Sequence, residues 1–182
     1  MATAAEKRTR YLTRRKGLPR GRKYQSIAVG GTFDQIHRGH RKLLSRAFAS
    51  GDMIFIGLTS DELVQSMGKK KIENSFPKRK NRLRRYIEET YPGRKYRITK
   101  LEAAFGPGIF KPGIEAIAVS EETLPNVAAA NERRRAAGLP DLKVEVVPLV
   151  LASDGRRISS TRIRAGEIDA EGRLIERGKR VK

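Results

Sequence analysis

The sequence of 182 residues contains no cysteine and no tryptophan, and aromatic residues make up 6% of it. Without cysteine the protein has no disulfide scaffold, no thiolate metal site and no cysteine nucleophile. No apolar run approaches the roughly 18 residues that a membrane-spanning helix needs. The basic N-terminus also lacks the apolar stretch of a secretory signal. We therefore expect a cytoplasmic protein that does not enter a membrane.

Acidic residues are also scarce, because 20 Asp and Glu face 40 Lys and Arg, for a formal net charge of +20. Between positions 6 and 23 the chain carries nine basic residues and one acidic residue. Such an excess of positive charge favours polyanionic partners, including nucleotides and nucleic acid. We predict a flexible basic arm at residues 1–23, and this arm is a candidate for non-specific binding of RNA.

Beyond residue 23, short apolar runs alternate with helical patterns. Strands are expected at Ser26–Val29, Met53–Gly57, Tyr96–Leu101, Ala116–Val119 and Val144–Val147, and helices at Gly39–Ala49, Asp61–Ser66, Asn81–Thr90, Thr123–Ala137 and Ser160–Ala165. This alternation is typical of a parallel sheet that is covered by helices on both faces. We predict one Rossmann-like, doubly wound α/β domain over residues 24–170, followed by a charged C-terminal tail at residues 171–182. Ligands of such sheets bind beyond the carboxyl ends of the strands.

The first chemical motif is an apolar run that ends in two glycines and leads to two histidines. It reads Ile27-Ala28-Val29-Gly30-Gly31-Thr32-Phe33-Asp34 and continues with His37-Arg38-Gly39-His40. The pattern predicts a strand, a tight turn and a helix N-terminus, where backbone N–H groups and the helix dipole attract a phosphate. Glycine lets the backbone turn sharply and lets a phosphate approach closely.

Two other interpretations compete for this motif. One is a plain strand-to-helix turn in which Asp34 is a cap and the histidines lie on the surface. It is disfavoured because His37 and His40 are the two histidines of the chain and both fall in this turn. The other is a zinc site, but two histidines and Asp34 are a small ligand set that no cysteine can complete.

A second motif near the other end of the chain places three hydroxyl residues before a basic helical pattern. It reads Ile158-Ser159-Ser160-Thr161-Arg162-Ile163-Arg164. The stretch predicts a helix N-terminus with spare donors, and Arg162 and Arg164 can add charge-assisted bonds to phosphate oxygens. Taken alone, it fits an ordinary N-cap with both arginines in solvent equally well. The two motifs together indicate a protein that binds a nucleoside triphosphate.

The two motifs resemble the signatures of the HxGH nucleotidyltransferase superfamily. A more specific resemblance is to the archaeal type of phosphopantetheine adenylyltransferase, and it extends over nearly all of residues 24–169. It is carried by Val29–Asp34, Gly39–Leu44, Gly57–Glu62, Asn131–Arg134, Gly138-Leu139 and Ile158–Asp169. The chain departs from that family at Glu102-Ala103-Ala104-Phe105, where acidic residues and a tyrosine are usual, so the substrate contacts of this loop stay open.

The resemblance implies a reaction in which 4′-phosphopantetheine attacks the α-phosphate of ATP directly and in line. The products would be dephospho-coenzyme A and pyrophosphate. By resemblance, His40 contacts the α-phosphate, His37 holds the outer phosphates, and Thr32 bridges the acceptor phosphate and the α-phosphate. Mg²⁺ is expected as a cofactor, bound mainly through the phosphates of ATP and not through protein side chains.

The resemblance also implies further binding residues. Nucleotide contacts are expected from Gly31, Phe33, Gly39, Ser120, Ser159, Ser160, Thr161 and Arg164. Lys70, in the run Lys69-Lys70-Lys71, would neutralise the reacting phosphates and the acceptor, and Arg82 would hold the acceptor phosphate. For both of these basic residues, a solvated charged surface is an equally good interpretation.

Two alternative functions remain. Another HxGH nucleotidyltransferase would use the same motifs with nicotinamide mononucleotide, flavin mononucleotide or glycerol 3-phosphate as the acceptor. A basic nucleic-acid-binding protein would explain the net charge of +20, but the low aromatic content gives little support to a surface on which bases stack.

Overall fold

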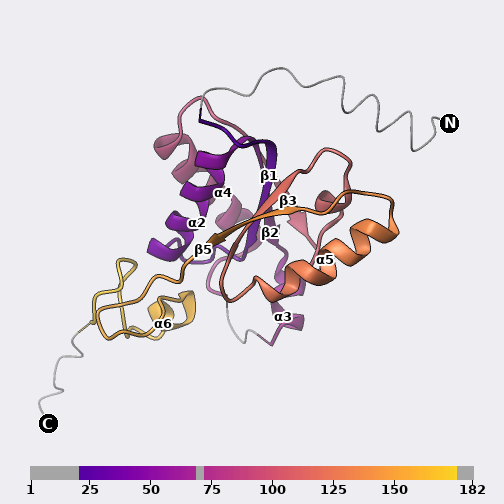
Figure 1. Cartoon of the computed structure of the whole chain (residues 1–182). Helices are drawn as coiled ribbons and strands as arrows, with labels where there is room; N and C mark the ends of the chain where they lie inside the picture. Colours follow the sequence, from indigo (N-terminus) through magenta and orange to yellow (C-terminus); the bar gives the residue numbers. More distant parts are fainter. Residues whose placement is uncertain (1–20, 69–71, 176–182) are drawn as a thin grey trace, which may run out of the picture.

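The computed structural model describes residues 21–68 and 72–175. Its centre is a sheet of five parallel strands in the order β3-β2-β1-β4-β5 (Figure 1). The strands are β1 (Tyr24–Gly31), β2 (Gly51–Thr59), β3 (Lys95–Leu101), β4 (Ala116–Ser120) and β5 (Lys143–Val147). This strand order confirms the predicted doubly wound α/β fold, and its direction reverses between β1 and β4, where such folds bind ligands.

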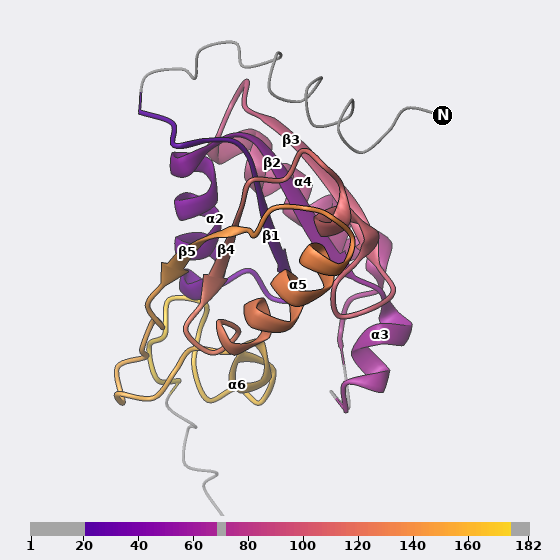
Figure 2. The same ribbon diagram turned by 45° about the vertical axis from the view of Figure 1, so that its right-hand side comes forward.

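Helices cover both faces of this sheet. They are α2 (Arg38–Ser50), α3 (Asp61–Ser66), α4 (Phe76–Thr90), the short 3₁₀ helix η1 (Pro107–Phe110), α5 (Pro125–Ala136) and α6 (Ser160–Arg164). Helices α2 and α4 lie on one face and α5 on the other (Figures 1 and 2). Helices α3 and α6 lie at the lower end of both views, next to the carboxyl ends of the strands. None of the helices in the described ranges is long and apolar enough to cross a bilayer.

Strand β1 is buried on both faces because its side chains alternate between two apolar clusters. Ile27 and Val29 belong to the cluster that includes Leu44 of α2 and Leu83 of α4. Ala28 belongs to the cluster on the opposite face, with Val127 of α5. A strand between two helical layers carries a continuous apolar run, as β1 does at Ile27-Ala28-Val29.

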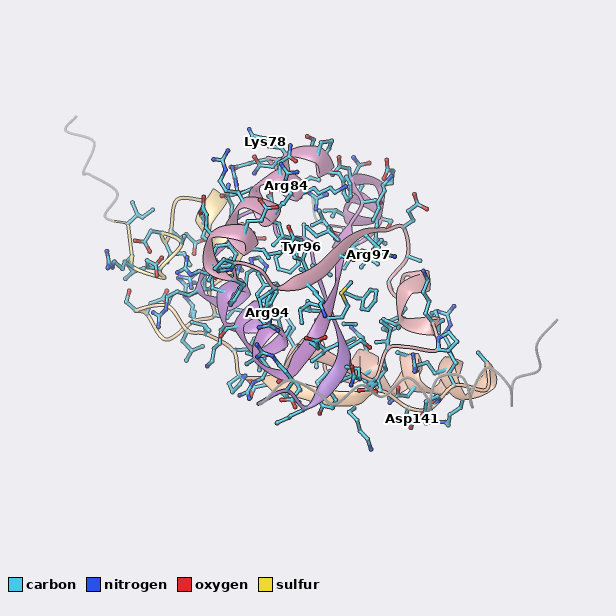
Figure 3. All side chains as sticks on the ribbon, turned by 90° about the horizontal axis from the view of Figure 1, so that it is seen from above. Lys78, Arg84, Arg94, Tyr96, Arg97 and Asp141 are labelled. Atoms are coloured by element: carbon cyan, nitrogen blue, oxygen red, sulfur yellow. The ribbon has the colours of Figure 1, made fainter. Side chains whose placement is uncertain are left out.

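Helix α4 begins at Phe76, earlier than the predicted start at Asn81. Phe76 packs against the core cluster, and the side chain of Arg79 is fully buried. Because the charged residue Arg79 occupies a core-facing position, the apolar pattern did not indicate that the first turn of α4 is helical. Figure 3 shows Tyr96 of β3 close to α4, and the Tyr96 hydroxyl donates to Glu88 at 3.2 Å.

Residues 149–175, called here the C-terminal unit, pack on the start of α2. Their own apolar cluster contains Ala152, Ile158 and Ile168. Arg41 of α2 donates to both carboxylate oxygens of Glu171 at 2.5 and 2.6 Å. The N–H of Arg38 donates to the carbonyl of Ala170 at 3.0 Å. The second motif is thereby fastened beside the first, although more than a hundred residues separate them in the sequence.

Both ends of the described chain contact the domain. Lys23 pairs with the nearly buried carboxylate of Glu145 at 3.1 Å, and Arg22 donates to the carbonyl of Ala49 at 3.0 Å. At the other end, Leu174 forms a β-bridge with Ile168. The predicted basic arm lies outside the described residues up to position 20, and the predicted C-terminal tail lies outside them from position 176.

Candidate active site

The turn after β1 follows the glycine pair that ends the strand, and it contains an unusual phenylalanine. Phe33 is fully buried and has a φ of 49°, a conformation that side chains other than glycine rarely adopt. Its ring folds back over Gly31, where a Cβ atom would lie 3.0 Å from the ring atom Cε2. Gly31 is therefore needed for packing, whereas the expected sharp turn at the glycine pair is not found, because both glycines lie in β1 without a positive φ.

His37 ends this turn and caps α2. Its Nδ1 accepts from the backbone N–H of His40 at 3.4 Å, and the two imidazole rings stack with their centroids 3.9 Å apart. Burial, with smaller contributions from His40 and Arg41, lowers the pKa of His37 from 6.5 to about 3. His37 is thus neutral at physiological pH, and the predicted helix N-terminus at the two histidines is confirmed.

His40 is oriented by the backbone of the same turn. Its Nδ1 lies 3.1 Å from the carbonyl oxygen of Gln35, and because a carbonyl only accepts, Nδ1 carries the proton in this bond. Nε2 then accepts in the neutral ring and donates in the imidazolium form. A contact from Nε2 to a phosphate oxygen therefore requires the charged ring.

Gly39 leaves room for this histidine arrangement. A Cβ atom there would lie 3.1 Å from Cε1 and 3.2 Å from Nδ1 of the His37 ring. Gly39, expected as a nucleotide contact, thus has a packing reason of its own.

Helix α6 brings the second motif to the first. Ser159 caps it by accepting from the N–H of Arg162 at 3.3 Å, and the Ser160 hydroxyl donates to the carbonyl of Gln35 at 3.3 Å. Arg164 donates to Thr161 Oγ1 at 3.2 Å and to Asp34 at 2.7 Å. The hydroxyl residues of the second motif and the histidine turn therefore lie at the same place.

Asp34 joins these two motifs. Its carboxylate is fully buried and accepts from Arg164 Nη1 at 2.7 Å and from Asn74 Nδ2 at 2.9 Å. It also accepts from the backbone N–H groups of Glu73 and Asn74 at 3.3 and 3.2 Å. The alternative in which Asp34 caps the helix and the histidines lie on the surface is wrong, because His37 is the cap and is itself 6% exposed.

Comparison with known proteins identifies the family. The cytidylyltransferase-like family matches residues 28–166. The chain is 43% identical to a protein of Methanopyrus kandleri named phosphopantetheine adenylyltransferase, over 81% of this chain and 92% of that protein. It is 42% identical to a protein of the same name from Methanothermobacter thermautotrophicus, over 86% of this chain and 93% of that protein. The chain belongs to the phosphopantetheine adenylyltransferase family.

Solved structures agree with this fold. A protein of unknown function from Archaeoglobus fulgidus is 28% identical with a TM-score of 0.60, over 67% of this chain and 88% of that one. A protein of Thermoplasma volcanium titled as a lipopolysaccharide core biosynthesis protein gives a TM-score of 0.53 at 17% identity, over 67% of this chain and 94% of that one. At that identity the second likeness concerns the fold alone.

The remaining residues expected from the phosphopantetheine adenylyltransferase family occupy three places. Ser120 ends β4, and its hydroxyl lies 3.2 Å from that of Thr123. Arg82 of α4 is exposed and donates to the carbonyl of Asp34 at 3.1 Å, which places it beside the first motif. Lys70 lies outside the described residues.

The two arginines of the second motif differ in their partners. Arg162 is bound within the C-terminal unit by Asp154 at 2.5 Å and Glu167 at 2.9 Å, and its side chain is 11% exposed. Arg164 reaches across to Asp34 in the first motif. The alternative with both arginines in solvent is therefore wrong, and Arg164 is the one that faces the histidine turn.

The sequence analysis missed Asn74 and Arg79 as members of this site. Asn74 binds Asp34 through its backbone and its side chain. Arg79 binds the carbonyl of Thr32 at 2.7 Å. The available signal was weak, because Arg79 stands inside the basic run Lys78-Arg79-Lys80. The sequence gives no reason to expect that Arg79 is buried while its two neighbours are exposed.

Proposed function

We propose that this chain transfers the adenylyl group of ATP to 4′-phosphopantetheine. A phosphate oxygen of the acceptor forms a bond to the α-phosphorus of ATP while the bond to the α,β-bridging oxygen breaks. The products are dephospho-coenzyme A and pyrophosphate, and no covalent enzyme intermediate is involved. The expected location is the cytoplasm, where ATP is available.

The observation that carries this proposal is the meeting of two phosphate-binding motifs at one edge of the sheet. The Asp34–Arg164 pair and the bond from Ser160 to Gln35 hold α6 against the turn that contains His37 and His40. The hydroxyl and cationic side chains at the starts of α2 and α6 are groups that bind phosphate oxygens. The family relationship supports 4′-phosphopantetheine as the acceptor.

The chemistry follows from positioning and charge. We infer that the charged form of His40 donates from Nε2 to the α-phosphate as negative charge builds there. His37 is neutral and supports the outer phosphates and the orientation of the His40 ring, while Thr32 contacts the acceptor phosphate. Ser159, Thr161 and Arg164 bind the departing pyrophosphate. Such a site accelerates the reaction by holding both substrates in line.

Mg²⁺ is part of the proposal as an ion carried by ATP. When bound, it neutralises charge on the triphosphate. The donor set of the turn fits an ion held by phosphate oxygens better than one held by the protein. Asp34 is the buried carboxylate of the turn, and its oxygens are engaged by Arg164 and Asn74.

The test is to incubate the pure protein with ATP, Mg²⁺ and one acceptor at a time, and to identify the products by mass spectrometry. The acceptors are 4′-phosphopantetheine, nicotinamide mononucleotide, flavin mononucleotide and glycerol 3-phosphate, the last also with CTP. We expect dephospho-coenzyme A from the first and no product from the others. A His40→Ala preparation controls for contaminating host enzymes. A product from another acceptor would keep the reaction class and overturn the substrate.

A further inference from the structure

Arg79 is a fully buried cation that joins three carbonyl groups at the carboxyl edge of the sheet. It donates to Thr32 at 2.7 Å, to Thr59 at 2.8 Å and to Asn74 at 3.0 Å. Its carboxylate partner is Asp61, at 2.6 Å, whose side chain is 32% exposed. These bonds connect the ends of β1 and β2 with the segment that leads into α4.

The bond to Thr32 fixes the peptide group that joins Thr32 to Phe33. A trans peptide is planar, with its C=O and its N–H on opposite sides. When Arg79 holds the carbonyl towards α4, the N–H of Phe33 must point away from α4. Phe33 is one of the residues that the family resemblance implies as nucleotide contacts, and its N–H is the donor of this peptide group.

The hydrogen-bonding of the Phe33 N–H group is also unusual. In the described part of the chain it has no hydrogen-bond acceptor. Backbone N–H groups without a partner are rare in folded proteins unless water or a ligand binds them. Because Phe33 is fully buried, an anion that supplies this acceptor must displace part of the turn's surroundings as it binds.

The same peptide lies next to a strained residue. The φ of 49° at Phe33 is costly for a side chain with a Cβ atom, and such conformations persist only where their surroundings enforce them. Burial of the Phe33 ring and the bond from Arg79 to Thr32 enforce it from its two sides. Without Arg79, rotation of the peptide would relieve the strain and turn the N–H away from its present direction.

We propose that Arg79 is a positioning residue for the nucleotide, because it sets the direction of the Phe33 N–H and the placement of Thr32. This role rests on the proposed adenylyl transfer and adds to it a residue that touches neither substrate. A conservative Arg79→Lys change keeps the charge but cannot reproduce the planar set of donors that reaches three carbonyls.

The chain contains a matched control for this change. Arg134 of α5 is also fully buried and donates to the carbonyls of Pro140, Ile109 and Ile114. Helix α5 lies on the opposite face of the sheet from α4 (Figure 2). Arg134→Lys therefore disrupts a comparable buried arrangement without touching the turn after β1.

The experiment measures four quantities for the full chain and for both variants. They are the melting midpoint, the affinity for ATP by calorimetric titration without acceptor, and kcat and KM with 4′-phosphopantetheine at a temperature where all three proteins are folded. Both variants should melt at a lower temperature than the unchanged chain. Arg79→Lys should also lower kcat by about 100-fold and ATP affinity by about tenfold, whereas Arg134→Lys should leave ATP affinity unchanged.

A folded Arg79→Lys variant with unchanged kcat and ATP affinity would show that Arg79 only stabilises the fold, and would overturn the proposal. If this variant does not fold, Asp61→Asn releases one partner of Arg79 and should reduce the same two quantities to a smaller extent. Unchanged values there would likewise overturn the proposal. ATP binding by the unchanged chain without formation of dephospho-coenzyme A would instead overturn the proposed acceptor, while the titration would still decide the role of Arg79.

Discussion

At the scale of single residues, His37 connects the stability of the fold with pH. Its pKa is lowered by burial from 6.5 to about 3. Between these values the unfolded chain binds a proton that the folded chain rejects. The stability associated with neutral His37 is therefore complete above pH 6.5 and is lost as the pH falls towards 3, at up to about 1.4 kcal/mol per pH unit.

Replacement of His37 by Asn should remove this pH dependence. Asn retains an oxygen that can accept from the N–H of His40, so the helix cap is kept. We expect the unfolding free energy of His37→Asn to fall less steeply between pH 6.5 and pH 4 than that of the unchanged chain. Urea unfolding at pH 7, 6 and 5 measures the difference, and parallel curves would contradict the buried neutral state of His37.

His40 should affect the rate of reaction and not the binding of ATP. Its proposed contact strengthens as charge develops on the α-phosphate, so its loss raises the barrier more than it weakens the ground state. We expect His40→Ala to reduce kcat by at least about 100-fold, with ATP affinity nearly unchanged. Initial rates and calorimetric titration separate the two effects. A loss of ATP affinity with unchanged kcat would refute this role.

At the scale of elements, the strands were easier to predict than the connections between them. β1 and β4 are apolar runs because both faces of the sheet are covered, and the predicted strand positions are confirmed. The start of α4 and the contact between the two motifs at Asp34 could not be predicted in the same way. Each depends on a charged side chain, Arg79 or Asp34, that is buried by partners distant in sequence. A pattern that assigns charge to the surface places such residues in solvent.

The C-terminal unit has a glycine that its packing requires. Gly172 has a φ of 85°, and a Cβ atom there would lie 2.5 Å from Cδ1 of Ile158 and 3.1 Å from Cα of Ala152. Gly155 has a φ of 75° with no atom within 4 Å of such a Cβ. The two positions therefore separate backbone strain from steric clash.

We expect Gly155→Ala to cost about 1 kcal/mol in unfolding free energy through backbone strain alone. Gly172→Ala should cost about 1–3 kcal/mol more, because Ile158 and Ala152 must move. It should also weaken ATP binding, since Ile158 precedes the capping residue Ser159. Urea unfolding and ATP titration of both variants test this, and equal costs would argue against tight packing around Gly172.

At the scale of the whole molecule, the net charge of +20 is unevenly divided between the described residues and the rest of the chain. Lys23 and Arg22 belong to the packed domain, so a truncation that tests the basic arm should stop at residue 20. If this arm binds RNA, the affinity of the full chain should fall steeply with salt.

Removal of residues 1–20 should then abolish RNA binding and leave kcat for adenylyl transfer unchanged, because β1 and the turn after it remain intact. Filter binding at two salt concentrations, alongside the rate assay, provides the measurement. RNA binding that is insensitive to salt, or that survives the truncation, would exclude the arm as its source.

The attachment of the C-terminal unit to α2 has a consequence for heat resistance. The unit supplies half of the proposed triphosphate site, yet it joins the sheet domain through side-chain pairs such as Arg41–Glu171 and Asp34–Arg164. Local detachment breaks these pairs and leaves the apolar layers around β1 intact, so it requires less free energy than global unfolding. On warming, turnover would cease before the sheet melts and would return on cooling. The highest temperature at which the protein works would then be set by the contact between the C-terminal unit and α2, and not by the apolar core.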